Sequence, residues 1–259
     1  LERPRGLAIS HGDLAKGSRV LKPVADPAAP GHIDLGNLTT SDTEDFLRKI
    51  KEQEFAIANT PLEQRRVPRM ALSRFYLAHG FAHEALGLMR LAAEDEPALA
   101  RDPSFNLLMG AAQALASRPR EADDYLERPG LANNPDAAVW RTITSAAQGN
   151  WTDARMAMSR GRAVVGNYPT LVQTEFNLAA ARTMVEVNDY GQAAAVLSEI
   201  DPSLATGKQA ARYDIIRGQI ADASGRSREA LTAFDLVEPS DERPLAAEAT
   251  YRGLRIRHR

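Results

Sequence analysis

Hydrophobic residues recur at helical spacing along most of this chain. In the segment 41–59, Phe46, Ile50 and Ile57 fall on one face of a helix, and Ser41-Asp42-Thr43-Glu44 before them is a capping-box pattern. We therefore expect one amphipathic helix there. From residue 61 onward, helix patterns follow one another between Pro and Gly, without the alternation rich in β-branched residues that is typical of strands. The pattern predicts an all-α protein.

The segment 1–40 lacks this periodicity and collects Pro and Gly, which predicts an extended arm or linker. We expect the arm to be separable from the helices, because it has too few clustered apolar residues to form a core. It could still lie along the helical part, over a surface that a partner peptide would use, through Leu14, Val20, Leu21, Ile33 and Leu35.

Proline marks several expected helix boundaries. Pro68 falls inside a helical stretch and implies a kink or a restart, while Pro119 and Pro129 predict a short helix between them. A last amphipathic helix is expected from Pro244 to about Ile256, within the segment 239–259. A capping side chain followed by Pro predicts helix starts at Thr60-Pro61, Asp102-Pro103, Asn134-Pro135 and Asp201-Pro202.

A pattern of coordinated positions repeats five times between residues 61 and 238. Each copy contains an alanine that we call the anchor: Ala85, Ala122, Ala154, Ala193 and Ala230. Five residues earlier, where a hairpin leaves its first helix, stand Gly80, Ser117, Gly149, Asn188 and Gly225. Twelve residues before the anchor, where two helices would approach closely, stand Ser73, Gly110, Thr142, Ala181 and Gly218. Four residues after it, large apolar residues return to fill the space between repeats: Met89, Leu126, Met158, Leu197 and Phe234.

Together with Leu72, Tyr76 and Pro97 in the first copy, these positions resemble the tetratricopeptide repeat (TPR) family at its own spacings. The resemblance implies a right-handed α-α superhelix of about five helix-turn-helix repeats, with 239–259 as a capping helix or a truncated sixth repeat. It also implies a protein-protein interaction scaffold that binds a partner protein or peptide in a concave groove. The groove residues it implies are Met70, Arg74, Leu77, Leu107, Ala111, Val139, Ile143, Leu178, Arg182, Ile215 and Gln219. The family's carboxylate clamp uses Lys and Asn, whereas Met70 and Arg74 stand at those positions here, so a chaperone tail is not the expected ligand.

Composition narrows the classes of function. The chain is 44% hydrophobic, and its 32 Lys and Arg against 34 Asp and Glu give a net charge of -2, so no basic field favours nucleic acid. An RNA-binding helical-repeat protein is the first alternative, and a non-catalytic regulatory region of a larger enzyme is the second. The preference for Arg and Ala suggests a bacterial genome, and the absence of cysteine favours an exported, periplasmic protein.

No catalytic, cofactor or metal site is expected. His79 and His83 are four residues apart, but Gly80 lies between them and no third ligand is near. No phosphate-binding loop, nucleophile elbow or His-Glu-x-x-His motif occurs. No apolar run approaches the roughly 18 residues that span a bilayer, so we expect a soluble protein. Because Leu1-Glu2-Arg3-Pro4 is neither an initiator methionine nor a signal peptide, we expect a piece of a longer chain. Partner identity and oligomeric state stay open.

Overall fold

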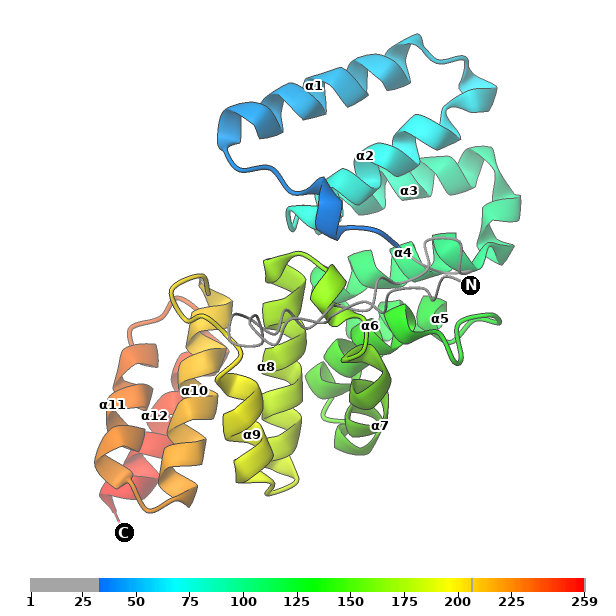
Figure 1. Ribbon diagram of the computed structural model, residues 1–259. Helices are drawn as coiled ribbons and strands as arrows, with labels where there is room; N and C mark the ends of the chain where they lie inside the picture. Colours follow the sequence, from blue (N-terminus) through cyan, green and yellow to red (C-terminus); the bar gives the residue numbers. More distant parts are fainter. Residues whose placement is uncertain (1–32, 206, 259) are drawn as a thin grey trace, which may run out of the picture.

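The structure, a computed structural model, describes residues 33–205 and 207–258 (Figure 1). Within these residues every regular element is a helix and no strand occurs, which confirms the all-α prediction. The α-helices are α1 (Thr43–Asn59), α2 (Arg66–Ala78), α3 (Ala82–Asp95), α4 (Pro103–Leu115), α5 (Pro119–Leu126), α6 (Pro135–Ala147), α7 (Trp151–Gly161), α8 (Thr170–Glu186), α9 (Tyr190–Leu197), α10 (Lys208–Ala223), α11 (Ser227–Val237) and α12 (Arg243–Arg257). Short 3-10 helices are η1 (Gly36–Leu38), η2 (Leu62–Gln64), η3 (Pro97–Arg101) and η4 (Val165–Asn167).

The helices pack as a row of antiparallel hairpins. The pairs α2/α3, α4/α5, α6/α7, α8/α9 and α10/α11 each form a hairpin, and α12 packs on α10 and α11. The first helices of neighbouring hairpins also contact each other, so that α4, α6, α8 and α10 lie next to one another in order. This is the stacking expected of a helical-repeat solenoid, and Figure 1 shows it running from α2 to α12.

The turn inside each hairpin contains one residue in the left-handed conformation. The residue five positions before each anchor has a positive φ in all copies: Gly80 83°, Ser117 59°, Gly149 77°, Asn188 60° and Gly225 74°. Ser117 and Asn188 adopt this left-handed conformation although they carry a Cβ, which is uncommon and costs free energy. The hairpin geometry therefore overrides the local preference of the backbone at these two turns.

The anchors form the contact between the two helices of each hairpin. Ala85, Ala122, Ala154, Ala193 and Ala230 are each 0% exposed. On the first helix, a Cβ added to Gly110 would lie 2.6 Å from the side chain of Leu126, and one added to Gly218 would lie 2.5 Å from the ring of Phe234. In these two hairpins, close packing against the large residue four positions after the anchor thus requires glycine.

We expect Ala193→Leu to lower the free energy of unfolding by about 1–3 kcal/mol, because three extra heavy atoms must enter a filled helix contact. Urea denaturation followed by circular dichroism measures the change. Ala195→Leu is the matched control, since Ala195 lies on the same helix and is exposed. If the two variants unfold at the same urea concentration, Ala193 is not a close-packing position.

Two of the predicted helix starts are confirmed by side-chain caps. The carboxylate of Asp102 accepts a hydrogen bond from the backbone N–H of Ser104 at 2.8 Å, at the start of α4. The side-chain oxygen of Asn134 accepts one from Ala137 at 2.8 Å, at the start of α6. The predicted short helix after Pro119 and the last helix are also present as α5 and α12.

Other predicted starts are wrong. Thr60-Pro61 leads into η2, and α2 begins only at Arg66, which places Pro68 in the first turn, where a helix needs no backbone donor. The implied restart near Pro68 is therefore correct. Asp201-Pro202 begins a turn in which Asp201 accepts a hydrogen bond from Ser203 at 2.9 Å, while α10 starts at Lys208. The N-cap of α1 is Asp42 and not Ser41, because the Asp42 carboxylate accepts from Asp45 N–H at 2.7 Å.

Candidate functional site

The predicted groove residues all lie on the first helices of the hairpins, and we call the side of the solenoid that these helices form the inner side. Most of the predicted groove residues are buried. Of the groove residues that the resemblance implies, only Arg74 and Arg182 are half-exposed. The others pack in the core: Met70, Leu77, Leu107, Ala111, Val139, Ile143, Leu178, Ile215 and Gln219. Their side chains pack mainly between the helices, and of these nine only Ile143 and Ile215 also border a cavity.

A cavity of about 920 Å³ lies on the inner side, more than the 360 Å³ of a second cavity between α9, α10 and α11. Its wall comes from the turns after α2, α4 and α6 and from the faces of α8, α10 and α12. Three of the predicted groove residues line it, namely Ile143, Arg182 and Ile215. This cavity is therefore the candidate site.

The cavity exists because the solenoid curls tightly. The turn residue Gly80 approaches Leu171 at the start of α8, since a Cβ on Gly80 would lie 2.9 Å from the Leu171 side chain. The turn residue Ser117 approaches Lys208 at the start of α10, with 3.4 Å between the hydroxyl oxygen and Nζ. Both pairs are separated by 91 residues in the sequence. Each turn thus lies against the hairpin three places further along, which closes one side of the cavity.

Ion pairs between neighbouring helices cross the cavity wall. Arg212 on α10 pairs with Glu175 on α8 at 2.5 Å. Arg182 on α8 pairs with Glu248 on α12 at 2.8 Å, and its guanidinium also donates to Gln219 at 3.0 Å. Burial raises the pKa of Glu248, but the guanidinium groups of Arg182 and Arg252 outweigh this and hold the pKa below its ordinary value. Glu248 therefore stays ionised, and these side chains hold α8, α10 and α12 together.

Lys208 differs from the two arginines on the cavity wall. It is exposed, and its Nζ lies 3.4 Å from the hydroxyl of Ser117. Among residues 33–205 and 207–258, no carboxylate forms an ion pair with it. The cavity therefore has one cation more than its carboxylates neutralise, at the place where two distant turns meet.

The sequence pattern missed Glu175, Lys208, Arg212 and Glu248. On α8, the side chains that line the cavity are Leu171, Glu175, Ala179 and Arg182, spaced as one face of a helix. The predicted position Leu178 is one residue from this face, about 100° around the helix, and points into the core. Continuing the helical spacing back from Arg182 toward the start of α8 could have found Glu175.

In the part of the chain that the structure describes, no cluster of three or more His, Cys, Asp and Glu could hold a metal ion. No helix there combines the length and hydropathy that crossing a membrane requires. Two of the predicted arm contacts, Ile33 and Leu35, are described and lie in the core, whereas Leu14, Val20 and Leu21 fall outside the described residues.

Comparison with known proteins adds no assignment. The chain matches no protein-family model, and no curated protein is detectably similar to it. The resemblance to tetratricopeptide repeats therefore stays a prediction from the repeat pattern of the sequence.

Proposed function

We propose that this protein is a TPR-like scaffold that holds a segment of a partner protein in the cavity on the inner side of its hairpins. The observation that carries the proposal is the cavity itself. Its volume of about 920 Å³ lies in the upper part of the range of roughly 300–1,000 Å³ typical of binding pockets. A rigid stack of hairpins surrounds it, which is how solenoids present binding surfaces.

The lining favours a peptide that carries apolar side chains and a carboxylate. The half-buried side chains of Leu115, Leu171 and Leu245 supply apolar contact area, and Lys208 supplies a cation that no described carboxylate neutralises. A carboxylate of the partner would form a charge-assisted hydrogen bond with Lys208. On the same wall, the side-chain N–H of Gln148 donates to Asp123 at 2.6 Å, so the Gln148 side-chain oxygen is the group that can accept from a peptide backbone N–H.

The charges of the cavity argue against the RNA-binding alternative. Phosphate binding needs arginine or lysine side chains that are free to contact the backbone of the nucleic acid. Arg182 and Arg212 are instead bound to Glu248 and Glu175. A regulatory region of a larger enzyme remains compatible with the same peptide-binding surface. A bacterial source and an exported location belong to this proposal too, and residue usage alone supports them.

Affinity capture with two cavity variants tests the proposal. Ala147→Trp places an indole in the cavity from an exposed position, and Lys208→Glu reverses the unpaired charge. We expect each variant to retain its helical circular dichroism and to lose at least about tenfold in partner recovery, since roughly 1.4 kcal/mol corresponds to tenfold. Ala195→Trp, on the outer helix α9, is the control for added bulk.

Unchanged capture by both cavity variants would disprove binding in the cavity. Reversal of Arg182 is a less useful test than the sequence indicated, because Arg182 contacts Glu186, Glu248 and Gln219. Its replacement by Glu would break these contacts and disturb the packing of α8 against α10 and α12. Loss of binding in that variant would not separate recognition from folding.

A further inference from the structure

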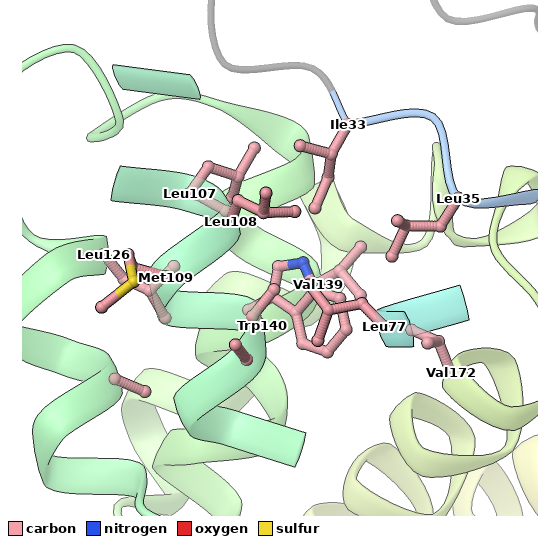
Figure 2. Packing of buried hydrophobic residues seen from close by; sticks show 14 of the residues in the cluster. Ile33, Leu35, Leu77, Leu107, Leu108, Met109, Leu126, Val139, Trp140 and Val172 are labelled. Carbon is pink, nitrogen blue, oxygen red and sulfur yellow. The ribbon is translucent and has the colours of Figure 1, made fainter. Parts of the chain in front are cut away.

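One segment of the chain already lies on the inner side like a bound peptide. Ile33 and Leu35 are 2% and 0% exposed, whereas Asp34 between them is exposed. Figure 2 shows both side chains pointing from the segment toward the helices that carry Leu107, Leu108 and Val139. Two apolar side chains, spaced by one exposed residue, therefore fill the inner face of the first three hairpins.

The next residue fixes the segment against η4, which joins the third hairpin to the fourth. A Cβ on Gly36 would lie 2.2 Å from the backbone oxygen of Asn167 in η4. No side chain other than hydrogen fits this contact. The surface thus favours a specific sequence pattern over residues 33–36: an apolar residue, any residue, a second apolar residue and then glycine.

Hydrogen bonds fix the end of the segment at the cavity. The backbone N–H of Thr40 donates to Nε2 of His79 at 3.0 Å, and Nδ1 of His79 lies 2.8 Å from the carbonyl oxygen of Phe75. The hydroxyl of Thr40 also lies 3.0 Å from Nε2 of His79, so both the backbone and the side chain of Thr40 contact the same ring nitrogen. His79 also lines the cavity. The end of the segment therefore contacts a residue of the cavity wall.

We propose that residues 33–40 are an intramolecular ligand of a peptide-binding surface, and that a partner segment of the pattern apolar-x-apolar-Gly occupies the same surface. The proposal rests on the proposed function, because the partner would continue from this surface into the cavity. Ser41 and Asp42, both exposed, join the ligand to α1, and no residue of α1 is buried. The link between ligand and solenoid therefore makes little contact with the core.

Cutting this link in the folded protein tests the proposal. A recognition site for a sequence-specific protease is inserted between Ser41 and Asp42, both exposed, so that the N-cap of α1 is kept. After cleavage, a fluorescent synthetic peptide of residues 33–41 is added and its anisotropy is followed. We expect the peptide to replace the N-terminal piece while the circular dichroism stays helical.

Peptide variants supply the controls. Exchanging both Ile33 and Leu35 for Ser removes two fully buried side chains and should weaken binding by at least about 100-fold. Replacing the exposed Asp34 with Asn should leave affinity within about threefold. Equal binding of the parent peptide and the double-Ser peptide would overturn the proposal.

Two further outcomes would show that residues 33–40 are a fixed part of the core. One is loss of helicity as the N-terminal piece leaves, and the other is no exchange of the peptide below the unfolding transition. If the insertion itself prevents folding, amide hydrogen exchange of the parent protein, without the inserted site, decides instead. The amides of residues 33–38 should then exchange by local opening, faster than those of α4 and α6. Exchange of residues 33–38 as slow as that of α4 and α6 would refute the proposal. Exchange of the peptide together with unchanged capture by Ala147→Trp would leave this inference standing and remove the cavity function alone.

Discussion

Replacing Trp140 with alanine should lower the free energy of unfolding by about 3–5 kcal/mol, the range for removal of a large buried aromatic side chain. Trp140 is 0% exposed and is the largest fully buried side chain in the part of the chain that the structure describes. Its ring meets that of Tyr168 edge to face, with centroids 5.7 Å apart. Figure 2 shows it beneath Ile33 and Leu35, beside Val139. The cavity left by alanine would therefore lie at the junction of the third hairpin, η4 and the N-terminal segment.

Trp151 is the matched control, because the chain has two tryptophans and this one is only half-buried on the cavity wall. Trp151→Ala should lower the free energy of unfolding by less than half as much as Trp140→Ala does. Guanidinium denaturation followed by far-ultraviolet circular dichroism measures both variants without depending on tryptophan fluorescence. A loss below about 1 kcal/mol for Trp140→Ala would mean that the central core is looser than the structure shows.

The sequence predicted the features that depend on contacts within one hairpin. Ala193 and Ala230 could be identified because every copy places a small residue where its two helices cross. Ser117 and Asn188 could be placed in turns because their spacing from the anchor is constant, although their own backbone preference is unfavourable. Repetition supplied information that no single position carries.

The candidate site depends on contacts between hairpins, which repeat spacing does not encode. The cavity forms because Gly80 meets Leu171 and Ser117 meets Lys208 across three hairpins. These contacts follow from the sum of small rotations between successive hairpins, so a local sequence pattern does not predict them. The predicted groove residue Leu107 is buried for a related reason, because Ile33 packs in the same cluster.

Helix starts show a second limit of local rules. Asp102-Pro103 and Asp201-Pro202 have the same two residue types, yet only the first begins an α-helix. The residues after Asp102 pack at once on neighbouring helices, with Phe105 and Leu107 buried. After Asp201, Ser203 and Leu204 are exposed, so their burial does not stabilise a helix directly after Pro202. Tertiary packing thus decides between a turn and a helix when the capping pattern allows both.

The smallest substitution with a large expected effect is Gly36→Ala. Its methyl group would lie 2.2 Å from the backbone oxygen of Asn167, closer than non-bonded atoms approach. The loop that carries Asn167 resists movement, because the hydroxyl of the buried Tyr168 donates to the Asp136 carboxylate at 2.6 Å. The N-terminal segment must therefore shift outward and expose Ile33 and Leu35. Each is worth about 1.5–3 kcal/mol when fully buried, and partial exposure of both should cost about 2–4 kcal/mol.

Gly87→Ala is the matched comparison for Gly36→Ala. Gly87 lies inside α3, and a Cβ there would meet nothing within 4 Å. Alanine in a helix interior is more stable than glycine by roughly 0.5–1 kcal/mol, so this variant should gain stability. The same chemical change is thus expected to have opposite signs at the two positions, and paired urea denaturation curves measure both. A Gly36→Ala protein that unfolds at the urea concentration of the parent would show that residues 33–38 do not pack against η4 in solution, and that the inner side of the first hairpins is open there.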